Sequence, residues 1–221
     1  MRSLGEIEAM AAGHHGGAEA VAALLPTPAP QRALKATPDD RWLSTLSRCV
    51  FSAGFNWKIV EKKWPAFEDA FHGFKPGPCS MMDDEAVEKA ARAGGIPHMA
   101  KALSIRENAV LFRDLAAQHG SAGAFFTTWP TDDYTSLLLR LKKKGARLGG
   151  TTTQYFLRFM GVDGFMLTGD VSTALIREGV VDKQPSSAKG MKAAQDAFNT
   201  WHAESGRPYM QISRLLALSV G

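Results

Sequence analysis

The chain has 221 residues, of which 45% are hydrophobic and 22% are charged, and its formal net charge at pH 7 is +4. These values are typical of an ordinary soluble globular protein, and the positive charge weakly favours an anionic partner. No apolar run approaches the ~20 residues needed to span a bilayer, and the N-terminus lacks the apolar stretch of a secretory signal, so no membrane partner is expected.

The only two cysteines, Cys49 and Cys79, lie far apart and lack the Cys or His spacing of a zinc site. A reducing cytoplasm therefore fits best. His14 and His15 form the only histidine pair, but their Gly/Ala-rich surroundings are more typical of a mobile tail than of a metal site. No metal site is expected.

Residues 1–36 mix Ala, Gly and Pro, which predicts a flexible or loosely packed N-terminal extension with one short helix over residues 19–25. The main domain is expected over residues 37–221. Its first helix begins with Thr37 as a capping residue and Pro38 at the first helical position. A buried stripe is predicted at spacings of three and four, formed by Trp42, Leu46, Cys49 or Val50, and Ala53.

The same pattern of acidic helix starts and glycine stops repeats to the end of the chain. Alternating period-two runs bounded by hairpin turns are absent, so we expect an all-α protein of roughly ten helices. In the longest of these, over residues 96–120, the expected apolar stripe comprises Met99, Leu103, Val110, Leu111 and Leu115.

Residues 137–159, "LLLRLKKKGARLGGTTTQYFLRF", have the organisation helix, glycine hairpin, helix. Gly149 and Gly150 would let another molecule approach the backbone, and a following helix capped by Thr151 or Thr152 would present free N–H groups, which is a geometry that binds phosphate. A charge run is often only a solvated helix end, but its place before the hairpin favours contact with a DNA backbone. The positive charges are Arg140, Lys142, Lys143, Lys144 and Arg147. The expected backbone-binding residues are Lys144, Arg147, Leu148, Gly149, Gly150, Thr151 and Thr152.

Asp170, in "LTGDVSTALIREG", lies twenty residues after Gly150 and at the start of another predicted helix. This arrangement resembles the helix-hairpin-helix motif of base-excision DNA glycosylases. Over about residues 41–162 the chain more closely resembles the 3-methyladenine DNA glycosylase I family, and "FNTWHAESGRPYMQIS" is similar to the closing helices of the wider superfamily. The resemblance implies a two-lobed all-α fold with a cleft between the lobes.

A glycosylase must extrude its target base from the DNA stack and fill the gap that the base leaves. The resemblance places Phe55 as the wedge, with a core phenylalanine as the alternative. It places Trp57 where a base would stack, with Asn56 at the pocket rim; the alternative is a structural tryptophan. Cys49 occupies the position of the family's base-recognising glutamate, although a cysteine is often buried for packing alone. His98 follows a second hairpin-like turn and could meet a phosphate or simply lie on the surface.

Breaking the N-glycosidic bond develops positive charge on the sugar, which a carboxylate can stabilise while it orients or deprotonates water. The resemblance assigns this role to Asp170. An aspartate in the first turn of a helix is also favoured by the helix dipole and by capping, which is the structural alternative.

The departures from the family shape the remaining expectations. The family's zinc-binding Cys and His residues have no counterparts here, so zinc is not expected. The position of the Schiff-base lysine of lyase members is Thr152, which favours a monofunctional enzyme. Hairpin carbonyls could hold a monovalent cation, as the superfamily suggests.

We therefore expect a monomeric glycosylase that removes a damaged, 3-methyladenine-like purine from double-stranded DNA. A first alternative is a non-catalytic protein on the same scaffold that binds damaged or abasic DNA, for which Cys49 is the motivating feature. A second is a helical enzyme or partner-binding protein unrelated to nucleic acids, which would lack salt-dependent DNA binding.

Overall fold

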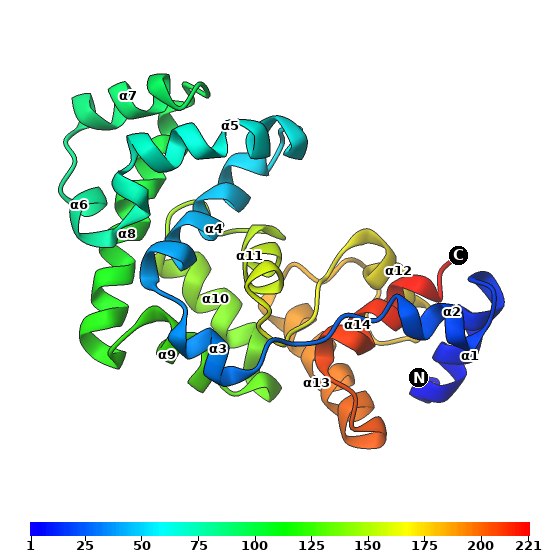
Figure 1. Cartoon of the computed structure of the whole chain (residues 1–221). Coiled ribbons are helices and arrows are strands. Elements are labelled where there is room, and N and C mark those ends of the chain that lie inside the picture. Colours follow the sequence, from blue (N-terminus) through cyan, green and yellow to red (C-terminus); the bar gives the residue numbers. More distant parts are fainter. The chain divides into compact units, whose positions relative to one another are not determined.

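The computed structural model describes all 221 residues and contains fourteen α-helices, two 3₁₀ helices and no strand, which confirms the predicted all-α class (Figure 1). The sequence predicted about ten helices because several of the others are five to seven residues long, too short to show a helical period. The α-helices are α1 (Leu4–His14), α2 (Ala18–Ala23), α3 (Gln31–Ala36), α4 (Asp39–Ser52), α5 (Trp57–Ala70), α6 (Pro76–Ser80), α7 (Asp84–Ala93), α8 (Met99–His119), α9 (Ala122–Thr128), α10 (Tyr134–Lys144), α11 (Thr152–Met160), α12 (Gly169–Arg177), α13 (Ala188–Ser205) and α14 (Tyr209–Leu218), and the 3₁₀ helices are η1 (His72–Phe74) and η2 (Thr131–Asp133).

The chain divides into two compact units rather than an extension followed by one domain. Unit 1 comprises Met1–Ala29, Trp129–Leu139 and Gly161–Gly221, and unit 2 comprises Pro30–Thr128 and Arg140–Met160. Both units are assembled from separate stretches of sequence, and the change between them near residue 139 falls inside helix α10. No composition shift marks such a boundary, so the predicted domain 37–221 did not anticipate it.

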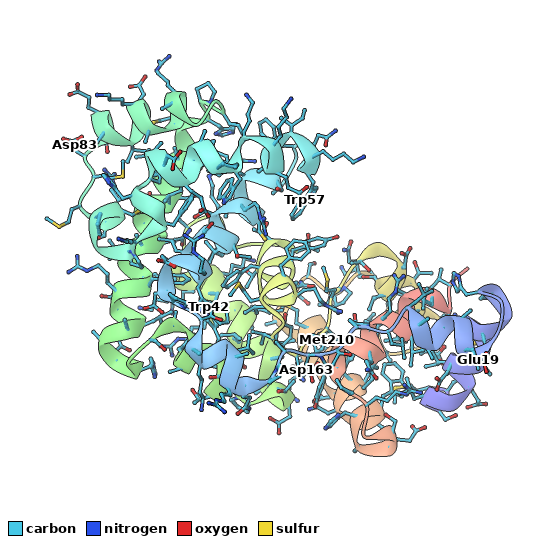
Figure 2. All side chains as sticks on the ribbon, in the orientation of Figure 1. Glu19, Trp42, Trp57, Asp83, Asp163 and Met210 are labelled. Carbon is cyan, nitrogen blue, oxygen red and sulfur yellow. The ribbon has the colours of Figure 1, made fainter.

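Unit 2 is built around the aromatic side chains of helices α4 and α5. Trp42 is fully buried in α4, and its ring stacks on Phe126 with the centroids 4.9 Å apart (Figure 2). The predicted stripe of α4 is buried through Val50, whereas Ala53 is exposed because the helix has ended there. Thr37 does not cap this helix as expected: its hydroxyl donates to the carbonyl of Ala33, and Pro38 occupies the N-cap position.

Helix α8 buries a different face from the one predicted. Val110, expected in the stripe, is 45% exposed, whereas Lys101 and Asn108 are buried. Polar side chains on the buried face misled the sequence prediction, which followed only the apolar residues. The buried residues of α8 are Lys101, Ala102, Ser104, Ile105, Asn108, Ala109, Phe112 and Leu115.

The first 29 residues are a packed part of unit 1 and α3 belongs to unit 2, which corrects the expected flexible or loosely packed extension over residues 1–36. The predicted short helix is present as α2, and α1 packs along α14 (Figure 1). Ser3 and Glu6 form a capping box at the start of α1, and Ile7 is fully buried. The prediction from composition was wrong because alanine is a strong helix former as well as a common residue of mobile tails.

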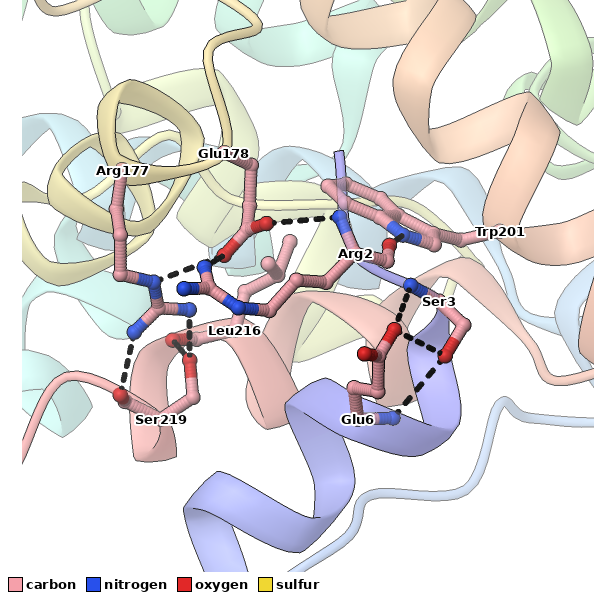
Figure 3. Close-up of polar contacts among 8 residues, drawn as sticks. All are labelled: Arg2, Ser3, Glu6, Arg177, Glu178, Trp201, Leu216 and Ser219. Atoms are coloured by element: carbon pink, nitrogen blue, oxygen red, sulfur yellow. Dashed lines mark hydrogen bonds and ion pairs between the residues drawn. The ribbon is translucent and has the colours of Figure 1, made fainter.

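Glu178 connects this segment to the rest of unit 1. Its carboxylate accepts hydrogen bonds from the backbone and guanidinium of Arg2 at 2.9 Å each and from Arg177 at 2.8 Å (Figure 3). The indole N–H of Trp201 donates to the carbonyl of Arg2 at 3.0 Å. Arg177 also donates to Ser219, so that both termini of the chain share one polar network.

None of the helices combines the length and the apolar character that a membrane span requires.

Candidate nucleic-acid interface

The predicted hairpin lies between α10 and α11 in unit 2, and it turns within seven residues, from Gly145 to Thr151. Gly150 has a φ of +57°, a conformation that favours glycine. A Cβ atom on Gly149 or Gly150 would meet no protein atom within 4 Å, so packing within the protein does not require glycine at either position. This open surface allows another molecule to approach the backbone closely.

Gly145 is needed for a different reason. A Cβ atom there would lie 2.4 Å from the side chain of Leu148 and 3.0 Å from the amide oxygen of Asn108. Leu148 is itself 2% exposed, so it anchors the hairpin to the core rather than presenting a side chain to a partner. The sequence marked Gly145 only as a helix stop.

Asn108 of α8 holds the hairpin by hydrogen bonds to its backbone. The sequence analysis did not predict this role. The Asn108 amide donates to the carbonyl of Ala146 at 3.0 Å and accepts from the N–H of Ala146 at 2.9 Å. The Asn108 side chain is fully buried and Ala146 is half-buried, so this reciprocal pair ties the hairpin backbone to the core of unit 2. The sequence offered no signal for it, because Asn108 lies outside the apolar stripe that was predicted for this helix.

The predicted charge run is divided between a solvated surface and specific contacts. Lys142, Lys143 and Lys144 are exposed, which agrees both with a solvated helix end and with contact to a DNA backbone. Arg147 is also exposed, but its Nε donates to the carbonyl of Ala100 at 2.9 Å. The guanidinium of Arg140 lies over the ring of Phe125 at 5.4 Å.

Protein hydrogen bonds engage the hairpin carbonyls that a monovalent cation would use. The carbonyl of Leu148 accepts from Thr153 Oγ1 at 2.9 Å, and that of Gly150 accepts from Gln154 Nε2 at 3.3 Å. Since a carbonyl oxygen has a second lone pair, a cation would have to use that remaining position. The cation stays a prediction, as does the expected lack of zinc.

The loop between α4 and α5 presents the predicted wedge and stacking residues in unit 2. Phe55 is 43% exposed, which excludes the alternative of a core phenylalanine. Asn56 caps α5 by accepting a hydrogen bond from the N–H of Lys58 at 3.0 Å, so its side-chain oxygen has a local structural role. Its place at a pocket rim stays a prediction.

Trp57 is the first residue of α5 and is half-buried (Figure 2). Its ring lies 5.7 Å from that of Tyr155 and 5.3 Å from that of Phe159, both on α11, the second helix of the hairpin motif. Phe159 is 48% exposed. The sequence did not identify these two α11 aromatics, although their four-residue spacing placed them on one helix face.

Cys49 is 2% exposed, in agreement with the alternative of structural burial. Burial raises the pKa of its thiol to about 12, against a smaller opposing effect of Arg48. The thiol is therefore neutral at pH 7 and supplies no negative charge in place of the family's glutamate. Its contact with a base stays a prediction.

His98 occupies the N-cap position of α8 and is half-buried. Its ring meets that of Phe55 edge-on, with the centroids 6.1 Å apart. The two side chains line an open hollow together with Ile96, Pro97, Met99 and Ala100. The fold thus joins two of the residues that the sequence singled out separately.

Asp170 lies in the first turn of α12, in unit 1. The capping alternative does not apply, because Thr168 is the N-cap and accepts from the N–H of Val171 at 3.4 Å. The Asp170 side chain is exposed and makes no hydrogen bond or ion pair within the protein. A favourable interaction with the helix dipole remains, and the carboxylate is otherwise available to a ligand.

Comparison with known proteins shows similarity to the same family that the sequence motifs resemble. Residues 34–136 match the model of the methyladenine glycosylase family. No curated protein matches the sequence at a significant level.

Solved structures with a similar fold include two of 3-methyladenine DNA glycosylase I from Staphylococcus aureus, each with a TM-score of 0.50 and 23% identity over 57% of this chain, covering 78% and 77% of their own chains. The 8-oxoguanine DNA glycosylase from Methanocaldococcus jannaschii has a TM-score of 0.54 and 13% identity over 95% of this chain and 89% of its own. The chain therefore has the helix-hairpin-helix DNA glycosylase fold. The predicted resemblance to the 3-methyladenine DNA glycosylase I family is confirmed.

Proposed function

Because a methyladenine glycosylase segment lies within a helix-hairpin-helix glycosylase fold, we propose that the protein is a monofunctional DNA glycosylase acting on an alkylated or otherwise damaged, 3-methyladenine-like purine in duplex DNA. The observation that carries this proposal is that unit 2 contains both an open glycine hairpin and an aromatic cluster. The cluster consists of Trp57 and of Tyr155 and Phe159 on α11, the helix that follows the hairpin. The first suits a phosphate backbone and the second suits a planar base.

In this proposal the hairpin backbone at Gly149 and Gly150 binds DNA phosphates, assisted by the exposed lysines at the end of α10. Phe55 enters the space that the extruded nucleotide leaves, and the base stacks on Trp57. A cationic alkylated purine is attracted to aromatic faces and is already a good leaving group, so a neutral Cys49 is compatible with its recognition.

The hydrolysis needs one further group. Asp170 stabilises the positive charge that develops on the sugar and takes a proton from the attacking water, while the base departs with the electron pair of the broken C–N bond. Thr152 begins α11 where lyases of the superfamily carry a lysine, and a hydroxyl group cannot form a Schiff base. The products are then the free base and an abasic site with an intact strand.

The direct test compares the release of free base from methylated duplex DNA by the wild type and by Asp170→Asn. We expect the substitution to slow release by ~100-fold, the lower end of the effect of removing a transition-state stabiliser. Asp182→Asn is the matched control, because Asp182 is also exposed in unit 1 and the change in charge is the same.

If Asp170→Asn releases base at the wild-type rate, the protein is still a glycosylase, but Asp170 is not its catalytic group. The second candidate function, non-catalytic recognition of damaged or abasic DNA, is favoured by the neutral, buried Cys49 at the glutamate position. Salt-dependent binding to an abasic duplex without base release from any alkylated substrate would establish that function instead.

A further inference from the structure

Lys101 is a buried lysine in the first turn of α8 that the proposed function does not use. Its side chain is 5% exposed, and lysine is almost never buried to this extent without partners. Burial, together with the nearby charge of Arg147, lowers its pKa. A group with such a desolvation cost needs compensating contacts, and those observed lie at the end of α4 and on the loop that follows it.

The ammonium group of Lys101 binds the end of α4. Nζ donates to the carbonyl of Phe51 at 2.9 Å and to that of Ala53 at 2.6 Å. These carbonyls belong to the last turn and C-cap of α4, where no further helical N–H is available, and the helix dipole favours a positive charge there. Two of the three N–H donors of Lys101 are thereby used.

The same ammonium group lies over the Phe55 ring, 4.4 Å from its centroid, in a cation–π contact. Phe55 is exposed, so neighbouring side chains rather than a core must set its orientation. Lys101 and the edge-on ring of His98 are the contacts that do so, and both come from the start of α8.

This turn of α8 also contacts the hairpin. Ala100, next to Lys101, accepts the hydrogen bond from Arg147, and Asn108 two turns later holds Ala146. One helix therefore fixes both the loop that carries Phe55 and the hairpin that carries Gly149 and Gly150.

We infer that Lys101 is a positioning residue that orients the Phe55 ring for insertion into DNA, without touching DNA itself. This inference rests on the proposed function, because it assigns Lys101 a role through the wedge. Its effect should appear only while Phe55 is present.

The test is a double-mutant cycle between Lys101→Met and Phe55→Ala. The measured quantity is the ratio of affinities for a duplex with an abasic-site analogue and for the undamaged duplex. We expect each single substitution to reduce this preference by about tenfold, and the double variant to be no worse than Phe55→Ala alone. Lys101→Arg should restore most of the preference. Lys62→Met is the charge-matched control on the exposed face of α5, and it should not change the preference.

Additive losses in the cycle, or an equal loss in the control, would overturn the inference. If Lys101→Met does not fold, Lys101→Gln replaces it, since an amide keeps donors for the carbonyls but lacks the charge over the ring. Melting temperatures are measured for every variant. A variant that keeps the wild-type melting temperature is folded, so its loss of preference reports on the position of the loop.

A second readout keeps this inference separate from the proposed function. The N–H of Phe55 donates to the carbonyl of Ser52 at 3.0 Å, so hydrogen exchange at that amide reports on the loop without DNA. Faster exchange in Lys101→Met than in Lys62→Met is expected even if the wild type shows no preference for damaged DNA. Unchanged exchange would show that Lys101 does not hold the loop.

Discussion

Trp57 shows how a single aromatic side chain can be held by the protein and still meet a ligand. Tyr155 and Phe159 contact its ring at interplanar angles of 58° and 79°, so neither covers a face of the indole by parallel stacking. Edge-on and tilted contacts are favourable in themselves and fix the ring. A base stacked on Trp57 would lie parallel to the indole, in a geometry that neither of these two contacts has.

Trp57→Ala should reduce the catalytic efficiency of base release by about 5- to 150-fold, which corresponds to a stacking energy of ~1–3 kcal/mol per base. Release of methylated purine under single-turnover conditions measures the effect. Ile59→Ala, on the next exposed apolar residue of α5, should change the rate by less than about twofold, since that side chain has no assigned contact with the base. An equal loss in both variants would point to damage to the helix and not to lost stacking.

The hairpin is the structural element whose shape matters most for the proposed function. Its surface glycines are free of packing demands, whereas its buried side depends on Gly145, Leu148 and Asn108. One side of the hairpin is thus packed against the protein, and the other side is open. A phosphate backbone needs such an open side to approach the hairpin N–H groups closely.

Asn108→Ala should lower the free energy of unfolding by about 1–3 kcal/mol, because it removes both hydrogen bonds to the backbone of the half-buried Ala146. It should also weaken DNA binding at low salt, since the hairpin backbone is no longer fixed. Denaturant unfolding followed by circular dichroism and a DNA titration measure the two effects. Val110→Ala, at an exposed position of the same helix, is the control. A stable Asn108→Ala variant with unchanged DNA affinity would contradict this account of the hairpin.

At the scale of the whole molecule, the N-terminal segment closes unit 1 through Glu178. Burial alone would raise the pKa of this carboxyl, but hydrogen bonds from the Arg2 backbone, Arg177 and the Arg2 side chain outweigh it and lower the pKa below 4.5. A lowered folded-state pKa means that the unfolded chain binds the proton more readily. The stabilisation is therefore present above about pH 4.5 and is lost as the pH falls through the folded-state value.

Glu178→Gln should accordingly be less stable than the wild type near pH 7, and the difference should shrink as the pH falls below 4.5. Urea unfolding at a series of pH values from 7 to 3 tests this. Asp182→Asn, an exposed substitution in the same unit, is the control for the loss of one carboxylate charge. A difference between Glu178→Gln and the wild type that is constant over the whole range would mean that the ionised carboxylate is not the stabilising species.

The sequence by itself determined the helical class, the place of the hairpin, the α4 stripe through Val50 and the resemblance to a glycosylase family. These features follow from local rules, since helical periods, glycine stops and motif spacings are properties of neighbouring residues. Phe55 is exposed and Gly149 and Gly150 are free of packing contacts, as their predicted roles require, and those roles stay predictions.

Only the tertiary structure decided which polar residues lie inside. Lys101 and Asn108 occupy the buried face of α8 because their partners are backbone groups some 40 to 50 residues away in the chain, which no helical period can reveal. The folded N-terminal segment and the two discontinuous units have the same origin. Burial and pairing are set by contacts between distant parts of the chain, and the free energy of those contacts overrides what composition indicates locally.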